Sequence, residues 1–469
     1  MAPAAELDTV RAPGTSGAAR TEPLRARWPA TRPPSGVAAA AARTALVTLL
    51  DRGACDRFEL IHPDRTVTVH GPSEILDLRS RTGPDSGAGR DTGAADRPDG
   101  TGLTARIVID DARTWTAVAS GGSSGLGRAY IDGWWTSDDL TTVLRALTRS
   151  LEPLDEIRNR VTRITAPVTD RLRRLRPGPT RRTNRLDIAS HYDLSNDFFA
   201  LFLDETMTYS AGVFPSPTAT MADASRAKYD RLIDKLGVTA DHHILEVGTG
   251  WGGFALRAAS RVGCRVTTTT ISAEQYREAT ARIAAAGLSD QVTVLATDWR
   301  DLRGRYDRVV AIEMIEAVHW RHYDSFFQAL GERLDPHGLL GLQAICVPEW
   351  RYRRTRTTED FIRRYVFPGG CLPSIGTITT EAAGSARLQT IDVDDLTAHY
   401  AETLDRWTRR FEEHWDTMEG LGLDERFRRL WRFYLAYCSA AFIERHCTLN
   451  QVILAGPRWR PAGLALRPC

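Results

Sequence analysis

The stretch ILEVGTGWGGF, residues 244–254, decides the fold that we expect of this chain. It begins with apolar and β-branched residues, breaks into a glycine cluster, and continues as a helical pattern up to Val262. This order predicts a strand, a tight turn and a helix. Glycines at positions 248, 250 and 253 allow a sharp turn and a close approach to a ligand, as nucleotide-binding α/β folds require. Such turns also occur without a ligand, so the motif alone leaves that alternative open.

Two features of the flanking sequence favour S-adenosylmethionine over a dinucleotide as the ligand. A pyrophosphate requires exposed amides and no nearby carboxylate, yet Glu246 stands at the strand end, where it can receive an amino group. The next expected strand, residues 265–271, has no acid at its end to bind the ribose of NAD. S-adenosylmethionine carries an ammonium group and a ribose but no phosphate, and it therefore agrees better with this sequence.

The composition is that of an ordinary soluble globular protein of two or three domains, with 42% hydrophobic and 26% charged residues. The formal net charge of +2 implies no general preference for anionic or cationic partners. We expect neither a membrane span nor export, because no apolar run is long enough and the window 37–50 is typical of a soluble helix. Seven scattered cysteines without CxxC spacing predict reduced thiols in a cytosolic protein, with no metal site.

Four segments are expected along the chain. Residues 1–36 carry few large apolar side chains, so we expect a disordered tail. Residues 37–155 predict a small α+β domain, interrupted at 80–102 by a Gly-, Asp- and Arg-rich tract that we expect to be a disordered insertion. A basic linker, 156–185, follows, and residues 186–469 predict the main α/β domain.

The linker 156–185 combines an apolar stripe with strong positive charge. Apolar residues from Ile157 to Leu175 recur at spacings of three and four, which predicts one face of a helix interrupted near Pro167. Ten arginines and one acid between residues 158 and 185 give a local charge of 10 − 1 = +9. A solvated linker explains this pattern, and so does an amphipathic segment on anionic lipid. Nucleic acid is disfavoured, because no recognised motif accompanies the arginines.

Strands and helices alternate after residue 186, which predicts a doubly wound, mostly parallel sheet of the Rossmann type. Glu246, Thr270, Asp298 and Glu316 each fall at the end of an expected strand. Because the carboxyl ends of parallel strands meet at one edge, we expect these side chains to face one site. The C-terminal third is expected to be mainly helical, and its aromatic stripe indicates either a core or a lid over an apolar ligand.

Several separate motifs, taken in order, resemble the cyclopropane-fatty-acyl-phospholipid synthase family of S-adenosylmethionine-dependent methyltransferases. They are HYDLSNDFFALFLDETMTYSAGVF (191–214), the glycine turn, TISAEQY (270–276), DWRDL (298–302), EMIEAV (313–318), DFIRRYVFPGGCLPS (360–374) and YLAYCSAAF (434–442). GLGRAYIDGWWTSDDL (125–140) resembles the N-terminal domain of the longer members, which act on phospholipids. The resemblance implies a methyltransferase sheet with helical lid insertions, and a lipid-binding or dimerising role for residues 37–155.

The resemblance also implies contacts to the cofactor. The MTYS motif would close over the methionine part of S-adenosylmethionine, and the turn glycines would approach its backbone. Thr270 and Gln275 would reach the ribose, and Trp299 would stack on the adenine, although an ordinary core position explains this tryptophan too. The expected cofactor-binding residues are Tyr209, Ser210, Glu246, Gly248, Gly250, Gly252, Thr270, Gln275, Asp298 and Trp299.

In the family, the double bond of a cis-unsaturated acyl chain attacks the sulfonium methyl group, and a base then removes a proton so that a cyclopropane closes. An alkene is a weak nucleophile, so a dry pocket that aligns the reactants should supply most of the rate. The family base is thought to be a bicarbonate ion held by a glutamate, a histidine, a tyrosine and backbone groups near a cysteine. The resemblance assigns this catalytic set to Glu316, Tyr400, Gln343, Ile345, Ala211 and Cys438.

Two positions of this set differ from the better-known family pattern. Gln343 replaces the histidine, and Ala211 replaces a cysteine. A glutamine amide can still donate to an oxyanion and a backbone contact needs no thiol, so bicarbonate stays an expected ligand with a weaker hold. An anion beside Glu316 requires a shared proton, which predicts a raised pKa for this carboxyl group. Cys438 is interpreted as a packing residue, because a thiol has no step to perform.

The expected function is transfer of the methyl carbon to the cis double bond of an unsaturated phospholipid acyl chain, forming a cyclopropane fatty acid. The alternatives are the same transfer ending in a methylene or methyl branch, as some relatives do, and methylation of another lipid-like metabolite. A lipid-binding protein with a decayed active site is a third alternative, suggested by Gln343 and Ala211. We expect a cytoplasmic protein attached peripherally to the inner face of the membrane, with a possible homodimer and no nucleic acid partner.

Overall fold

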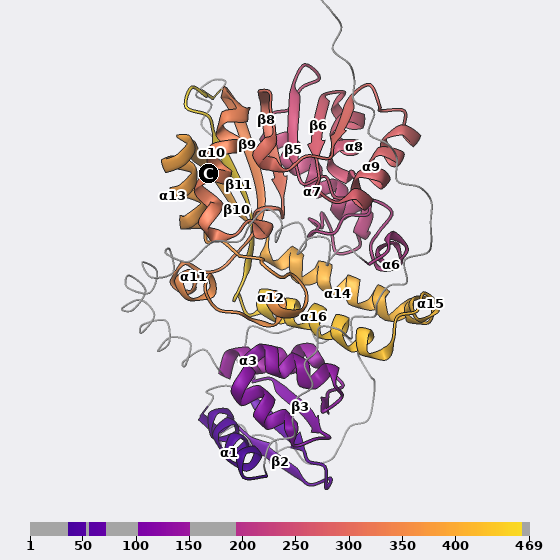
Figure 1. Cartoon of the computed structure of the whole chain (residues 1–469), viewed down its shortest axis with the longest axis vertical. Helices are drawn as coiled ribbons and strands as arrows, with labels where there is room; N and C mark the ends of the chain where they lie inside the picture. The colour runs from indigo at the N-terminus through magenta and orange to yellow at the C-terminus, as the bar shows by residue number, and fades with distance from the viewer. Residues whose placement is uncertain (1–35, 53–55, 72–101, 151–193, 462–469) are drawn as a thin grey trace, which may run out of the picture.

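The described part of the chain forms two sheets with a layer of helices between them (Figure 1). The computed structural model describes residues 36–52, 56–71, 102–150 and 194–461. Apart from residues 36 and 102, the expected tail, insertion and basic linker lie outside these ranges. The expectations for those three segments therefore stay predictions.

The N-terminal part is a four-stranded sheet covered by helices. Its strand order is β2-β1-β3-β4, with β1 parallel to β3 and the other neighbours antiparallel. Alternate residues of β1 point into the core, where Phe58 and Leu60 are buried. The elements are α1 (Gly36–Arg52), β1 (Arg57–Ile61), β2 (Val67–His70), β3 (Thr104–Ile109), α3 (Arg113–Ile131) and β4 (Trp135–Thr136), and residues 140–150 are helical. This arrangement is the α+β layout expected for the segment.

The larger sheet confirms the doubly wound, mostly parallel fold. Its order is β10-β11-β9-β8-β5-β6-β7; β11 runs antiparallel to both of its neighbours, β9 and β10, and the other described neighbours pair in parallel. The winding reverses at β5, which is where such sheets bind their ligands. The strands are β5 (His243–Val247), β6 (Arg265–Thr269), β7 (Val292–Leu295), β8 (Tyr306–Ile312), β9 (Leu334–Cys346), β10 (Gln389–Asp395) and β11 (Thr448–Ala455).

The C-terminal third is mainly helical, as expected, but it also contains two strands that the sequence analysis did not predict, β10 and β11. β11 is almost wholly buried between β9 and β10, and a short buried apolar run has no periodicity that separates strand from helix. β10 alternates between exposed and half-buried residues at the edge of the sheet. Pairing with distant strands, rather than local pattern, therefore sets both elements.

Helices cover both faces of the larger sheet. Ile244 of β5 packs in the core formed with α7, α8 and α9, whereas its neighbour Leu245 packs with α10 and α13 on the other face. α8 begins directly after the glycine turn, as expected. The helices are α7 (Met221–Lys235), α8 (Gly253–Val262), α9 (Ala273–Ala285), α10 (Tyr323–Arg333) and α13 (Ile375–Ala386).

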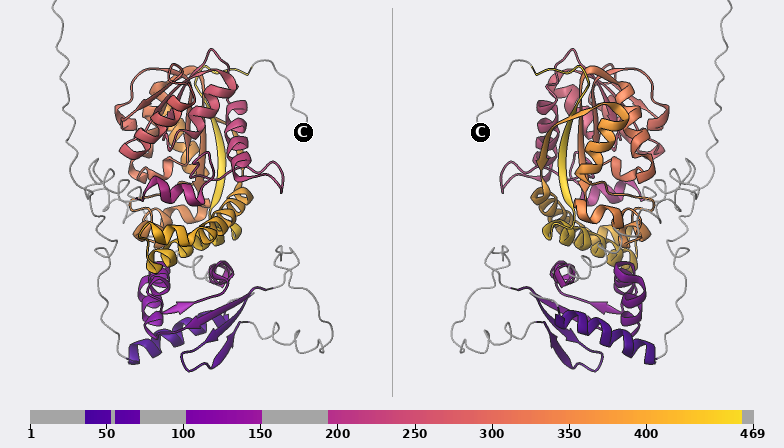
Figure 2. Two further views of the ribbon diagram at one scale, coloured as in Figure 1. Left: turned by 90° about the vertical axis from the view of Figure 1, so that its right-hand side faces the viewer. Right: turned by 90° about the vertical axis from the view of Figure 1, so that its left-hand side faces the viewer.

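A layer of helices lies between the larger sheet and the N-terminal part (Figure 2). α14 (Thr397–Glu413) packs against α16 (Glu425–Ile443), and α15 (Trp415–Gly420) joins them. α16 also contacts α3, where Arg429 donates to the carbonyl oxygens of Tyr130 and Trp135. We call α14, α15 and α16 the lid helices, and they carry the aromatic stripe noted in the sequence.

Short helices complete the surroundings of the lid helices. They are α6 (Asn196–Phe202), α11 (Glu349–Thr355) and α12 (Phe361–Tyr365). α6 packs against α14 and buries three phenylalanines, Phe198, Phe199 and Phe202, in the same core as the lid helices. Among the described residues, no helix is both long and apolar enough to cross a membrane.

Candidate active site

The glycine turn after β5 combines open space with tight packing. Gly248, Gly250 and Gly252 have φ values of 100°, 53° and 86°, in the left-handed region that favours glycine. No heavy atom of the described residues outside the immediate chain lies within 4 Å of the place that a Cβ would take at Gly250. At Gly253, by contrast, a Cβ would lie 2.6 Å from the hydroxyl oxygen of Tyr229 on α7. The turn therefore offers an open cradle at Gly250 and a fixed helix start at Gly253.

Glu246, one residue before the end of β5, is a buried carboxyl group beside this turn. Its Oε2 accepts a hydrogen bond from the hydroxyl of Thr268 at 2.6 Å. Burial raises the pKa of Glu246 to about 8, and the Thr268 hydrogen bond and the nearby charge of Lys228 act against that increase. An ammonium group beside the carboxylate would lower this pKa and be stabilised by it. The open turn and the buried acid together fit the amino-acid end of S-adenosylmethionine.

The expected ribose and adenine contacts follow β6 and β7, and several already have partners within the chain. Thr270 Oγ1 donates to Gln275 Oε1 at 2.8 Å, so the amide oxygen of Gln275 is engaged within the chain and its amide nitrogen is the group that could donate to a ribose. Arg300 binds both carboxylate oxygens of Asp298, at 2.8 and 2.9 Å, and its guanidinium lies over the ring of Trp299. The adenine contacts expected of Asp298 and Trp299 stay predictions.

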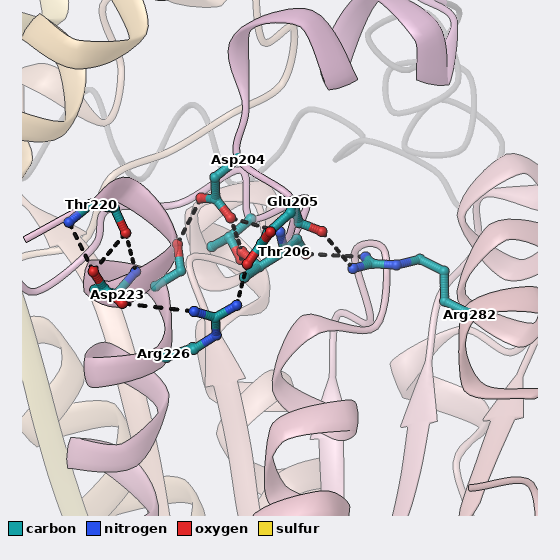
Figure 3. A network of polar contacts seen from close by, with 9 residues as sticks. Asp204, Glu205, Thr206, Thr220, Asp223, Arg226 and Arg282 are labelled. Carbon is teal, nitrogen blue, oxygen red and sulfur yellow. Dashed lines mark hydrogen bonds and ion pairs between the residues drawn. The ribbon is translucent and has the colours of Figure 1, made fainter. Parts of the chain in front are cut away.

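Arg282 of α9 fastens the segment before the MTYS motif to the glycine turn (Figure 3). It donates to the carbonyl oxygens of Glu205, Thr206 and Trp251 at 2.8–3.0 Å. Asp204 in turn accepts from the backbone nitrogen of Thr206 at 2.7 Å. Because Trp251 belongs to the glycine turn, these bonds hold the chain that leads to Tyr209 next to that turn.

Tyr209 and Ser210 have different surroundings. The hydroxyl of Tyr209 bonds with that of Tyr434 on α16 at 3.0 Å, and its ring packs 5.3 Å from that of Phe199. Ser210 Oγ accepts from the Nζ of Lys228 at 2.5 Å. Tyr209 therefore joins the aromatic core of the lid helices, whereas Ser210 lies beside the buried ammonium group of Lys228. The methionine contact expected of both residues stays a prediction.

The structure places a residue that sequence reasoning missed, Glu313, at the centre of the expected catalytic set. Its Oε1 accepts from the backbone nitrogen of Ala211 at 3.0 Å and from Gln343 Nε2 at 2.9 Å. Its Oε2 accepts from the hydroxyl of Tyr400 at 2.8 Å. The resemblance implies that these groups gather with Glu316 around an ion, and the structure gathers them around Glu313 instead. The reason is the backbone, because Glu313 directly follows β8 with a φ of 47° and turns its side chain inward.

Glu316 lies close to Glu313 but has fewer hydrogen-bond partners. Its Oε1 accepts from the backbone nitrogen of Ile345 at 2.6 Å, so these two expected residues do meet. Within the described ranges, its Oε2 is buried without a hydrogen-bond partner. Burial, followed by the charge of Glu313, raises the pKa of Glu316 to about 8. The expected direction is confirmed, but burial and a second carboxyl group of the chain account for it.

Lys228 of α7 supplies positive charge to this buried group. Its side chain is fully buried, which lowers its pKa to about 8, and the negative charge of Glu313 acts most strongly against this decrease. Burial also raises the pKa of Glu313, but Lys228 and three hydrogen bonds oppose it. Glu313 is therefore the better stabilised carboxylate, and Glu316, with its orphan oxygen, is the group that holds a proton at neutral pH.

A pattern in the sequence could have revealed some of the remaining residues of the site but not others. Cys438 lies on α16 with a thiol whose pKa burial raises, in agreement with a packing role. Glu313 stands at a strand end, as the other site residues do, and the same rule would have found it. Lys228 falls four residues from both Ala224 and Leu232 on the buried face of α7, where a lysine is unusual. Arg282 has no local signal, because its partners are distant backbone carbonyls.

Comparison with known proteins identifies the family. Residues 180–452 match the family model described as mycolic acid cyclopropane synthetase. The tuberculostearic acid methyltransferase UfaA1 of Mycobacterium tuberculosis is 43% identical over 345 residues, which cover 72% of this chain and 80% of that protein. A cyclopropane-fatty-acyl-phospholipid synthase of Escherichia coli is 32% identical over 359 residues, which cover 75% of this chain and 88% of that enzyme.

Solved structures of cyclopropane synthases are also similar to this chain. The mycolic acid cyclopropane synthase CmaA1, complexed with SAH and CTAB, has a TM-score of 0.54 and 30% identity, and the match covers 58% of this chain and 98% of that chain. The cyclopropane synthase MmaA2 from Mycobacterium tuberculosis has the same TM-score with 29% identity and the same coverage. The chain therefore belongs to the mycolic acid cyclopropane synthetase family and is an S-adenosylmethionine-dependent methyltransferase.

Proposed function

We propose that this enzyme transfers the methyl carbon of S-adenosylmethionine to a cis double bond in an acyl chain of an unsaturated phospholipid. The observation that carries the proposal is the neighbouring carboxyl groups of Glu313 and Glu316, which accept hydrogen bonds from β9 and, at Glu313, from the lid helix α14. Tyr400 reaches Glu313 from α14, and its ring stacks on Phe442 of α16 at 4.2 Å. An acidic site beside stacked aromatic rings suits a reaction that passes through a carbon cation, because the rings limit access of water that would trap the cation.

The residues of the candidate site have separate roles in this reaction. S-adenosylmethionine, when bound, supplies an electrophilic methyl group on a positively charged sulfur. The carboxylate of Glu246 and the open turn at Gly250 hold its amino-acid end. The aromatic rings of the lid helices exclude water and present π faces to the positive charge that develops on the acyl chain.

For the product, we favour a methylene branch, which a separate reductase would have to reduce to give a methyl branch. The relative with 43% identity is named for tuberculostearic acid, a methyl-branched fatty acid, and it matches this chain better than the synthase with 32% identity does. A cyclopropane, our first expectation from the sequence, is the second candidate, because the family model and the Escherichia coli relative are both named for it. Both products add the same CH₂ unit to the chain.

A basic cavity supports a phospholipid as the substrate. Its volume is about 420 Å³, and its charged lining residues are Arg321, Arg356, Arg363 and Glu359. Guanidinium groups recognise phosphate oxygens well. Cys371 also lines the cavity, and its backbone nitrogen donates to the carbonyl oxygen of Glu316 at 2.8 Å. A phosphate head group bound there would therefore border the segment that carries the carboxyl pair.

Peripheral attachment to the cytoplasmic face of the membrane is part of this proposal. The substrate chain resides in the bilayer, and the basic cavity suits its anionic surface. A homodimer through the N-terminal sheet is also proposed, on the family resemblance alone.

The test incubates the protein with methyl-labelled S-adenosylmethionine and vesicles of cis-unsaturated phospholipid, and then analyses the released fatty acids. Label should enter these fatty acids, and vesicles of saturated phospholipid should take up none. NMR of the product distinguishes a branch from a ring. Absence of label with the wild type would refute the proposal.

A further inference from the structure

The carboxylate of Glu313 occupies the hydrogen-bonding positions that the family resemblance assigns to bicarbonate. Those positions are the backbone of Ala211, the side chain of Gln343 and the hydroxyl of Tyr400, and all three donate to Glu313 at 2.8–3.0 Å. The fourth expected contributor, the backbone nitrogen of Ile345, donates to Glu316. Each expected donor is therefore already bound to a carboxyl group of the chain itself.

The side chain of Gln343 is fixed in this arrangement. Its Nε2 also donates to the carbonyl oxygen of Ala211 at 3.2 Å, and its Oε1 accepts from Gln451 Nε2 at 3.1 Å. With both ends of the amide engaged, rotation toward another anion would break contacts on each side. The residues present here therefore do not fit a bicarbonate ion.

Charge argues in the same direction. Lys228 is the cation that favours ionised Glu313, and Glu316 is a second buried carboxyl group beside it. A free anion would add a third negative centre to this buried group, at a cost in desolvation and repulsion. The carboxylate of Glu313 and a bicarbonate ion therefore cannot occupy this position together.

The backbone holds Glu313 in place at a cost in strain. Its φ of 47° lies in a region that residues other than glycine rarely adopt, and such strain gathers at functional sites. Its backbone nitrogen donates to the carbonyl oxygen of Gln343 at 2.7 Å, so the two residues are tied in both directions. Tyr400 keeps its proton because burial raises its pKa well above the ordinary value, and it therefore acts as a donor to Glu313.

We propose that Glu313 is a catalytic residue, the proton acceptor of this enzyme in place of a bound ion, an inference that rests on the proposed function. The π electrons of the alkene form a bond to the methyl carbon while the S–CH₃ bond breaks, which leaves S-adenosylhomocysteine and a carbon cation. A C–H bond of the transferred carbon then breaks, and its proton passes to a Glu313 oxygen. The electron pair closes the ring or, after a 1,2-hydride shift, forms the methylene double bond.

The experiment compares the full-length wild type with Glu313→Gly and Glu313→Gln in buffers purged of CO₂, with and without added bicarbonate. Wild-type methyl transfer to vesicles of cis-unsaturated phospholipid should not change with bicarbonate. Glu313→Gly frees the three donors and should lose activity by about 100-fold or more, and bicarbonate or formate should restore part of it. Glu313→Gln should stay inactive under both conditions, because an amide neither accepts the proton nor leaves room for an ion. Glu332→Gln, on the exposed side of α10, is the matched control.

A binding measurement without turnover separates this inference from the proposed function. NMR with ¹³C-labelled bicarbonate should detect binding to Glu313→Gly and none to the wild type, and calorimetry should give all variants the wild-type affinity for S-adenosylmethionine. Bicarbonate binding to the wild type, an active Glu313→Gln, or a folded Glu313→Gly that binds no ion would overturn the inference. If Glu313→Gly does not fold, the wild type and Glu313→Gln still decide the question. If the wild type labels no lipid, the proposed function fails, and the binding results alone decide whether Glu313 excludes the ion.

Discussion

The two halves of the candidate site, at the carboxyl ends of the strands, differ in how their polar groups find partners. In the cofactor half, at the ends of β5, β6 and β7, the turn is open at Gly250 and the buried Glu246 awaits a cation. In the base half, at the ends of β8 and β9 beneath α14, Glu313, Gln343 and Tyr400 are bonded to one another. We infer that the first half leaves its backbone accessible because S-adenosylmethionine has to bind and leave there. The second half needs no such opening, because the carboxylate of Glu313 belongs to the chain and is already hydrogen-bonded.

The largest effect that separates the halves is expected from Gly250→Val. A β-branched residue at a φ of 53° costs about 1–2 kcal/mol, and its side chain would fill the open side of the turn. We expect the affinity for S-adenosylmethionine, measured by calorimetry, to fall by about 100-fold or more, equivalent to about 2.7 kcal/mol.

Gly253→Ala is the matched control for that substitution. Its Cβ would meet the Tyr229 hydroxyl at 2.6 Å, so the free energy of unfolding should fall by about 1–3 kcal/mol from overpacking. Binding by the folded fraction should change much less than in Gly250→Val. Equal losses of affinity in the two variants would contradict the division into an open and a packed side of the turn.

Tyr400→Phe should impair the base half alone. It removes one of the hydrogen bonds to Glu313, while the phenyl ring keeps the stack on Phe442. We expect kcat to fall by about 10- to 100-fold, because the proton acceptor loses a partner that orients it and tunes its pKa. The affinity for S-adenosylmethionine and the melting temperature should stay near their wild-type values. An unchanged kcat would show that the Tyr400 contact has no part in the reaction.

The same division explains how much could be predicted from the sequence. A glycine turn and strand ends are local patterns, and the structure places Glu246, Thr270 and Asp298 at or just after the ends of β5, β6 and β7 as expected. The base half depends on one inward-turned side chain at a positive φ, Glu313, whose partners come from distant segments. No local pattern encodes such a contact set, and the resemblance drew attention to Glu316 instead. β10 and β11 were missed for the same physical reason, since strand pairing across the chain creates them.

Release of a proton when S-adenosylmethionine binds should distinguish the cofactor half from the base half. With a pKa of about 8, Glu246 is mainly protonated in the free protein at pH 7. The ammonium group of the cofactor favours the ionised form, so binding should lower this pKa and release on the order of one proton. Affinity should therefore rise with pH and level off above about pH 8.

Calorimetry in buffers of different ionisation enthalpy measures that proton directly. Glu246→Gln should abolish the release attributable to this group, and Glu316→Gln, which changes a carboxyl group of the base half, should leave it in place. Proton uptake on binding, or release that persists in Glu246→Gln, would assign the titration to another group such as Lys228, whose pKa is also about 8.

The smallest effect is expected at the basic cavity, which lies outside both halves. Arg356 lies over the ring of Trp320 at 4.6 Å and lines the cavity with two other arginines. Arg356→Ala should raise the KM for anionic phospholipid vesicles by about 3- to 10-fold, the loss of one charge-assisted phosphate contact, and leave kcat nearly unchanged. Added salt should narrow the difference in KM between Arg356→Ala and the wild type, because screening weakens the phosphate contact in the wild type.

Arg305→Ala is the control and should leave KM unchanged. Arg305 is exposed and lies just before β8, at the end of the strand opposite to Glu313. If Arg356→Ala lowers kcat instead, the cavity acts through the neighbouring Glu316 segment rather than through a head group, because Cys371 connects the two.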